Sequence, residues 1–194
     1  MNQQHAAPGR VVVLTGPTAV GKGTVVSRVR GTPGLWVSTS VTTRPARPGE
    51  VHGQHYYFID EAEMDRLIAD DGLLEWAEVH GAARYGTPRR EVVEAVNQGL
   101  VVLLEIDLQG ARQVRRTWPG ATFVFLAPPS EDELVRRLQG RGTETPEQQR
   151  RRLRTAEAEI AAMGEFDHVV VNDDIDRAAN ELLSLLGLRS HPNT

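Results

Sequence analysis

A lysine stands inside a glycine-rich segment, GPTAVGKGT, which covers residues 16–24. Of the 22 lysines and arginines in the chain, Lys22 is the one lysine. The ammonium group of lysine is a compact point charge that fits within a tight backbone loop, whereas the guanidinium fork of arginine is wide and rigid. A composition so biased toward arginine therefore indicates that Lys22 occupies a site where arginine cannot replace it.

The spacing Gly16-x4-Gly21-Lys22 is typical of a loop that binds phosphate. Glycines let backbone N–H groups point inward around phosphate oxygens, and the lysine reaches the β and γ phosphates. Residues 11–14 (VVVL) suit a buried parallel strand, and residues 24–29 (TVVSRV) suit the start of a helix. This order places the phosphates at a helix N-terminus, so the sequence predicts a nucleoside triphosphate site. The alternative is an ordinary strand-to-helix turn that carries a lysine by chance.

The composition of the chain excludes several classes of protein and of binding partner. The 194 residues suit one domain, and 40% hydrophobic with 25% charged residues is ordinary for a globular protein. Without cysteine there is no disulfide framework, thiolate zinc site or cysteine nucleophile. A net charge of -4 argues against a general nucleic-acid binder, and no apolar run approaches the length of a membrane span. We therefore expect a cytoplasmic protein with neither a nucleic-acid nor a membrane partner.

Apolar runs and helical patterns alternate along the chain. Further strands are expected at 35–39, 100–106, 121–126 and 167–171, and helices at 89–97, 110–117, 131–138, 146–163 and 175–186. Such alternation predicts an α/β fold with a mostly parallel five-stranded sheet flanked by helices, and ligands at the carboxyl ends of the strands.

Two stretches break this alternation. Residues 40–90 are rich in proline, glycine and aromatic residues and are interpreted as an inserted subdomain within a core made of residues 1–39 and 91–194. Residues 140–147 (GRGTETPE) have few apolar side chains and are interpreted as part of a lid at about 140–152. Two such pieces around a phosphate loop indicate a kinase that excludes water from the transferred group.

Charged residues in these stretches suggest a second substrate. Arg44 and Arg47 lie in a proline-stiffened loop and could capture a phosphate, although a solvated basic turn would look the same. Tyr56 and Tyr85 can donate hydrogen bonds to the same phosphate. Glu75 alternates with apolar neighbours, so it points either into a cleft or outward to water.

Other carboxylates divide into two kinds. Glu105 and Asp107 end a buried strand and point the same way, which favours a functional site because an unpaired buried charge is costly. Glu157 and Glu159 share a predicted helix with the arginines at 150–152 and 154. Most of that helix is interpreted as a solvated, ion-paired face.

Together these motifs resemble those of the guanylate kinases over nearly the whole chain. They are GPTAVGKGT, STSVTTRPARPGE, YYF, LLEWAEVHG, RYGT, EIDLQGA, FLAPPS, LQGRGTET and VVVNDD. A phosphate loop alone identifies only a superfamily, but the loop followed by the others in this order is highly specific. The resemblance implies a P-loop kinase core with a GMP-binding insert and a lid. It also implies transfer of the γ-phosphoryl group of ATP to GMP, and to dGMP, with Mg²⁺ accompanying ATP.

The resemblance assigns a role to each matching position. The GMP phosphate would be held by Arg44, Arg47, Tyr56 and Tyr85, and the guanine would be faced by Ser40, Glu75, Thr87 and Asp107. The ATP phosphates would be bound by Gly16, Pro17, Thr18, Ala19, Val20, Gly21, Lys22, Gly23 and Thr24, with Asn172 near the adenine. Arg137, Arg141 and Arg152 would close over the phosphates and, with Lys22 and Arg44, form the catalytic set.

The chemistry of guanine agrees with these assignments. Guanine has donors at N1 and N2 and an acceptor at O6, so Glu75 and Asp107 can accept from it while Ser40 or Thr87 donates to it. Two alternatives are a kinase of another nucleoside monophosphate, such as AMP, and a non-catalytic guanylate-kinase-like binding module.

The sequence departs from the pattern at two positions. Gly23 stands where many phosphate loops have a Ser or Thr that ligates Mg²⁺, so no direct protein ligand is assigned and the ion is expected to be held by phosphates and water. Arg84 stands where the guanylate kinases often have a tyrosine, and no role is drawn from it.

Overall fold

Five parallel strands form the central sheet. The computed structural model describes residues 9–79, 83–139 and 146–189, and within them the strand order is β2-β7-β1-β8-β9, with every pairing parallel. The strands are β1 (Arg10–Thr15), β2 (Leu35–Val37), β7 (Val101–Glu105), β8 (Thr122–Ala127) and β9 (His168–Val171). Each lies where the apolar runs predict it, because strands covered on both faces need nearly continuous Val, Leu and Phe.

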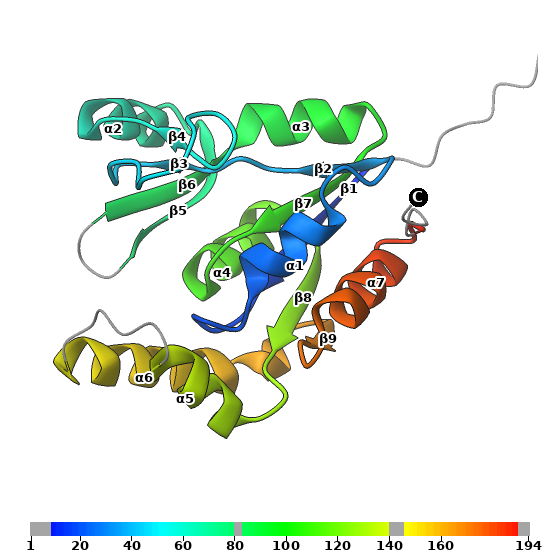
Figure 1. Cartoon of the computed structure of the whole chain (residues 1–194). Helices are drawn as coiled ribbons and strands as arrows, with labels where there is room; N and C mark the ends of the chain where they lie inside the picture. Colours follow the sequence, from blue (N-terminus) through cyan, green and yellow to red (C-terminus); the bar gives the residue numbers. More distant parts are fainter. Residues whose placement is uncertain (1–8, 80–82, 140–145, 190–194) are drawn as a thin grey trace, which may run out of the picture.

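Helices cover both faces of this sheet (Figure 1). On one face α1 (Lys22–Val29) and α7 (Ile175–Leu185) pack on Val12, Leu14 and Leu103. On the other face α3 (Arg89–Asn97) and α4 (Leu108–Thr117) pack on Val11, Val13 and Val102. Alternate residues of β1 therefore serve the two halves of the core, as the period of a strand requires. The predicted fold class is confirmed.

A second, smaller sheet lies within residues 41–88. Its strands are β3 (Val41–Thr42), β4 (Tyr57–Phe58), β5 (Leu73–Val79) and β6 (Ala83–Pro88), in the order β4-β3-β6-β5. Helix α2 (Glu61–Ala69) packs on it through Met64, which is completely buried against Val41 and Leu73. The sequence predicts an inserted subdomain at residues 40–90, but it does not reveal the individual strands of this sheet or α2.

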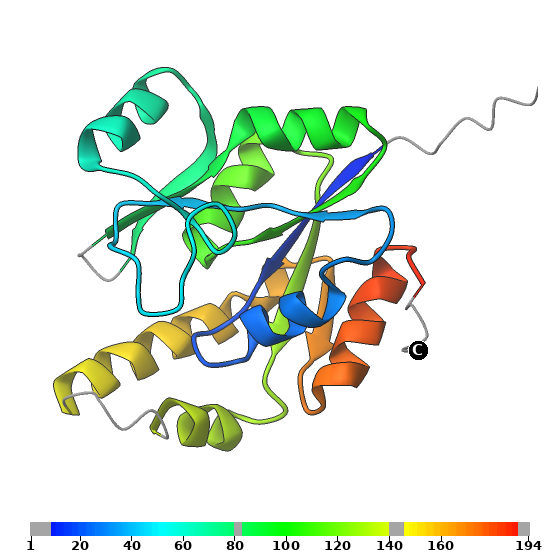
Figure 2. The same cartoon turned by 45° about the horizontal axis from the view of Figure 1, so that its top comes forward.

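Two helices lie across from the small sheet. Helices α5 (Glu131–Gln139) and α6 (Pro146–Ala161) pack together through Leu134, Leu138 and Ala156, and a short 3-10 helix, η1 (Met163–Glu165), follows. Figures 1 and 2 show the small sheet and the α5–α6 pair on either side of the loop between β1 and α1. Residues 140–145 of the expected lid lie outside the described residues.

Of the helices in the described part of the chain, none combines the length and apolar character needed to span a membrane.

Candidate functional site

A cavity of about 520 Å³ opens where the central sheet, the small sheet and α6 meet. The glycine-rich loop contributes Thr18 and Lys22 to its wall, and the carboxyl end of β7 contributes Glu105, Ile106 and Asp107. The small sheet and the segments that lead to it contribute Ser40, Tyr56, Glu75, Ala77, Glu78 and Tyr85, while α4 and α6 contribute Leu108, Gln109, Thr155, Ala158 and Glu159. Residues predicted from separate motifs thus share one cavity, at the expected edge of a parallel sheet.

The loop between β1 and α1 has the conformation that its glycines allow. Gly21 has φ 96° and caps the N-terminus of α1, and Ala19 also has a positive φ of 68°. A side chain on Gly16 would collide with the carbonyl oxygen of Leu126, so the close approach of the loop to β8 requires glycine there. The turn aims the N-terminus of α1 at the cavity, which favours an anion.

The ammonium of Lys22 lies within this loop. Its Nζ donates to the carbonyl oxygen of Gly16 and, at 3.4 Å, to that of Pro17. Burial lowers the pKa of Lys22, whereas the negative charges of Glu159 and Glu105 oppose that shift. The half-buried position inside the loop explains why the wider guanidinium of arginine does not suit the site.

Asn172 and Arg137 support the loop from behind. The Asn172 amide donates to the carbonyl oxygen of Val20 at 2.7 Å, and the side chain is only 3% exposed. Arg137 lies within 3.3 Å of the same oxygen and of the Asn172 carbonyl, and its Nε donates to Glu133 at 2.9 Å. Neither residue lines the cavity, and the expected contact of Asn172 with the adenine stays a prediction.

Glu75 and Asp107 come from different sheets to the same wall. Glu75 is 5% exposed, and its Oε1 accepts from the hydroxyl of Thr87 at 2.6 Å. Burial raises the pKa of Glu75 to about 7, helped by the nearby charge of Asp107 and opposed by the hydrogen bond from Thr87. Asp107 uses Oδ1 to accept from the Gly110 N–H at 2.7 Å, as the N-cap of α4. Thr87 is fully buried behind Glu75, so it positions that carboxylate and does not line the cavity.

Arg44 is held by a carboxylate and by aromatic residues. Its guanidinium forms two hydrogen bonds of 2.9 Å with Glu50, and its Nε donates to the Tyr85 hydroxyl at 3.1 Å. The guanidinium carbon lies 5.5 Å from the centre of the Tyr56 ring. The bond with Arg44 lowers the pKa of Glu50 to about 2, so this carboxylate stays ionised. Arg47 is exposed, and its backbone N–H donates to Glu50. Glu50 is a partner that the sequence analysis missed.

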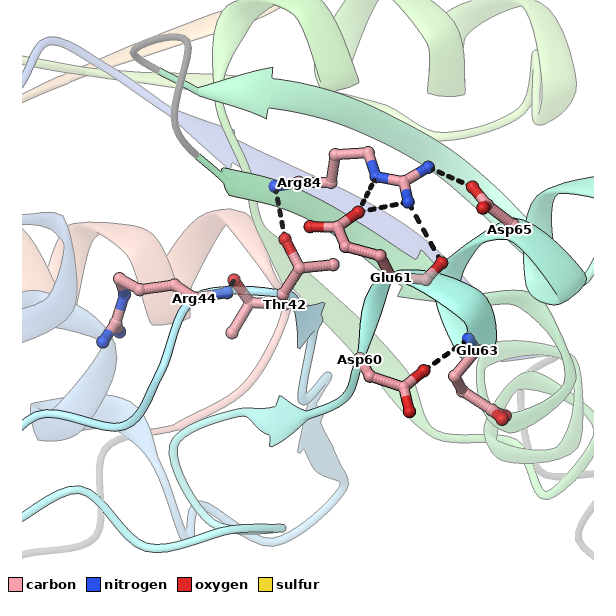
Figure 3. A network of polar contacts seen from close by, with 8 residues as sticks. Thr42, Arg44, Asp60, Glu61, Glu63, Asp65 and Arg84 are labelled. Carbon is pink, nitrogen blue, oxygen red and sulfur yellow. Dashed lines mark hydrogen bonds and ion pairs between the residues drawn. The ribbon is translucent and has the colours of Figure 1, made fainter.

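Arg84 has a structural role within the small sheet. Figure 3 shows its guanidinium turned toward α2, where Nε donates to Glu61 at 2.8 Å and Nη1 to Asp65 at 2.7 Å. Its backbone N–H donates to the hydroxyl of Thr43 at 3.0 Å. The side chain is 18% exposed, and the three contacts join β6 to α2 and to the residue that follows β3.

Glu159 corrects the interpretation of α6 as a solvated face at this position. The residue is 8% exposed, lines the cavity, and accepts from the backbone N–H of Thr18 at 3.3 Å. A signal was present in the sequence: Ala156 and Ile160 define an apolar face, and Glu159 stands three residues after Ala156 on that same face.

The remaining predicted residues are placed as follows. Arg152 is half-buried on α6, and Arg141 lies outside the described residues. Gly23 and Thr24 are exposed in the first turn of α1. A Cβ atom placed on Gly23 would lie 3.7 Å from Oε1 of Glu105. Within the described ranges, no group of three or more His, Cys, Asp and Glu residues is arranged to hold a metal ion.

Comparison with known proteins gives one consistent result. The family model described as "Guanylate kinase" matches residues 8–188. A guanylate kinase of Cutibacterium acnes is 59% identical over 95% of this chain and 94% of its own length. One from Streptomyces coelicolor is 59% identical over 91% of this chain and 89% of its own. The crystal structure of guanylate kinase from Anaplasma phagocytophilum superposes with a TM-score of 0.76, at 33% identity, over 93% of this chain and 86% of that one.

Proposed function

The chain belongs to the guanylate kinase family and is an enzyme of this kind, and we propose that it transfers the γ-phosphoryl group of ATP to GMP, giving ADP and GDP. The same reaction is proposed for dGMP, which carries the same base and phosphate. The observation that supports the proposal best is the shared cavity, in which a phosphate loop with its lysine faces the same space as the buried Glu75 carboxylate.

Recognition of guanine is assigned to the wall formed by Glu75, Asp107 and Ser40. The ionised carboxylate of Glu75 accepts from N1–H and N2–H₂ of the base, and the second oxygen of Asp107 accepts from the 2-amino group. The hydroxyl of Ser40 donates to O6. Thr87 contributes indirectly, because its hydrogen bond fixes one oxygen of Glu75 and leaves the other for the base.

Binding of the GMP phosphate is assigned to Arg44, Tyr56, Tyr85 and Arg47. Arg44 already stands beside both tyrosines, so its fork is positioned before the substrate arrives. Arg47 is exposed and completes the site by turning toward the phosphate. We propose that residues 40–90 act as the GMP-binding part of the enzyme and that the remaining residues form the ATP-binding core.

Phosphoryl transfer itself needs position and positive charge more than covalent chemistry. An oxygen of the GMP phosphate attacks the γ phosphorus, a new P–O bond forms, and the bond to the oxygen that bridges the β and γ phosphorus atoms breaks as ADP leaves. Lys22, Arg44 and the loop amides from residues 16–24 hold the oxygens on which charge develops. Arg137 already contacts this loop. Together with Arg141 and Arg152 of a lid at about 140–152, Arg137 would complete the group of cations that hold the phosphate oxygens during transfer.

Mg²⁺ is proposed to accompany ATP. Magnesium prefers oxygen ligands and keeps several waters, and the Glu105 carboxylate lies beside Gly23 at the start of α1. Glu105 would hold the ion through water, with the phosphates as its direct ligands. When bound, the ion neutralises charge on the phosphate oxygens.

The compartment proposed is the cytoplasm, where ATP is available.

A coupled assay of ADP release tests the proposal. With ATP and Mg²⁺, addition of GMP or dGMP should start ADP release, and GDP or dGDP should accumulate in equal amount. A kinase of another monophosphate would release ADP with AMP in preference to GMP. A non-catalytic binding module would bind GMP without releasing ADP, and that result would refute the proposal.

A further inference from the structure

Glu159 of α6 faces the phosphate loop although nothing in the proposed reaction uses it. The side chain lines the cavity beside Thr18 and Lys22, and the residue is 8% exposed. Its Oε2 accepts from the Thr18 backbone N–H at 3.3 Å. Thr18 belongs to the loop whose amides are assigned to the ATP phosphates.

Electrostatics connect the same carboxylate to the loop lysine. Among the charges that act on the Lys22 ammonium, Glu159 has the largest effect and counteracts the lowering of the pKa by burial. Lys22 in turn favours the ionised form of Glu159, whose pKa is raised by burial. Glu105 and Asp107 are the other carboxylates that act on Lys22. One amide and the lysine of the loop therefore face a negative group supplied by the protein.

We propose that the Glu159 carboxylate acts as an internal anion at the phosphate loop and is displaced from the Thr18 amide by the triphosphate of ATP. The inference rests on the proposed function, because the triphosphate is the incoming anion. The Thr18 amide has a single N–H and cannot donate it fully to two anions, so part of the binding energy of ATP is spent in displacing the carboxylate. The Glu159 carboxylate therefore lowers the affinity of the protein for ATP.

The test compares Glu159→Gln with Glu157→Gln. Glutamine keeps the size of the side chain and removes its charge, and Glu157 is exposed on the same helix, so the second variant controls for net charge. Dissociation constants for ATP, tripolyphosphate and GMP are measured by titration calorimetry. We expect Glu159→Gln to bind ATP and tripolyphosphate on the order of 5-fold more tightly or better, as is typical of coupling between two sites. Binding of GMP should not change, and Glu157→Gln should match the wild type.

Steady-state kinetics and a second variant add independent checks. KM for ATP should fall in Glu159→Gln while kcat does not rise. Glu159→Asp keeps the charge but withdraws it by one methylene, so its ATP affinity should lie between those of the wild type and Glu159→Gln. If Glu159→Gln melts at the wild-type temperature and binds ATP no more tightly than the wild type, the inference is wrong. If the wild type itself binds neither ATP nor tripolyphosphate, the proposed function fails.

Discussion

The hydroxyl of Thr87 donates a 2.6 Å hydrogen bond to the Glu75 carboxylate, and both residues are buried. They stand directly opposite each other on β6 and β5, so the pairing of the two strands fixes the contact. Burial raises the pKa of Glu75 to about 7, and the hydrogen bond from Thr87 limits that rise. Within the proposed function, this pair decides how much of the base-reading carboxylate is ionised at neutral pH.

Replacing Thr87 with valine should change the pH dependence of GMP use. The substitution keeps the shape of the side chain but removes the donor, so the pKa of Glu75 should rise above the wild-type value. Because an ionised Glu75 is needed, kcat/KM for GMP should fall most at acidic pH and recover as pH rises. A shift of the profile by about one pH unit is expected from the loss of one hydrogen bond of about 1 kcal/mol.

The profile is measured between about pH 5.5 and 9, a range that brackets the titration of Glu75. Thr117→Val is the matched control, because the Thr117 hydroxyl donates to the backbone of Leu74 and not to Glu75. Identical profiles for the wild type and Thr87→Val would contradict the role given to Thr87.

Glu75 should also affect stability in a pH-dependent way. Its pKa is about 7 in the folded protein and 4.5 for an ordinary glutamate, so the folded state binds the proton more tightly. The contribution of this tighter proton binding to the free energy of unfolding is fully present below pH 4.5 and is lost as pH rises through 7. The side chain of Glu75→Gln cannot ionise, so the stability of this variant does not fall in that way as pH rises.

Thermal denaturation at several pH values measures this effect. The melting temperature of Glu75→Gln, relative to the wild type, should be higher at about pH 8 than at about pH 5. Glu78→Gln is the control, since Glu78 lies on the same strand but is exposed. A difference that stays constant with pH would count against a protonated, buried Glu75.

Replacing Lys22 with methionine should leave the fold intact and remove most of the activity. In the proposed function the lysine is a preorganised donor to transition-state charge, so turnover should fall by about 10²-fold or more. Lys22→Arg should be impaired as well, because Nζ sits against the Gly16 and Pro17 carbonyls inside the loop. The measurement is kcat with melting temperature as the control, and near-normal turnover in either folded variant would disagree with the account.

Two arginines of the small sheet should behave differently. Arg44→Met removes the proposed phosphate ligand and should lower kcat/KM for GMP by about 10²-fold, a typical loss for one charged transition-state contact. Arg84→Met breaks the pairs with Glu61 and Asp65 and should lower the melting temperature while leaving KM for GMP unchanged. Equal effects of the two variants on kcat/KM for GMP would contradict the separation of their roles.

The core was predictable from the sequence because its strands are apolar runs and its helices carry a regular apolar face. The small sheet was not, since β3 and β4 have two residues each and cannot show a period. Helix α2 was missed although Asp60 caps it and Glu61 and Glu63 lie in its first turn. Met64 is its one fully buried residue, so the helix depends on packing against strands that were themselves undetected.

The sequence identified residues near the site better than it identified their orientation. Glu75, Tyr56 and Tyr85 line the cavity, whereas Thr87 is fully buried behind Glu75, and the contacts of these residues with GMP stay predictions. Glu159 belongs to a helix rich in charge, most of which the sequence indicates as a solvated face, so its place in the cavity wall was missed. Whether a polar side chain faces the cavity or is buried behind its wall depends on how the two sheets and α6 meet. The local periodicity of the sequence does not contain that information.

Base choice tests the central claim most directly. The measurement is kcat/KM for GMP, IMP and AMP in the wild type and in Glu75→Gln, with ATP and Mg²⁺. A site built to hydrogen-bond N1–H and the 2-amino group rejects an analogue without them by roughly 10⁴, so AMP should be a very poor substrate and IMP should lie between. Glu75→Gln should reduce use of GMP far more than it changes the affinity for ATP. AMP used as well as or better than GMP would contradict the guanine-specific assignment of this site.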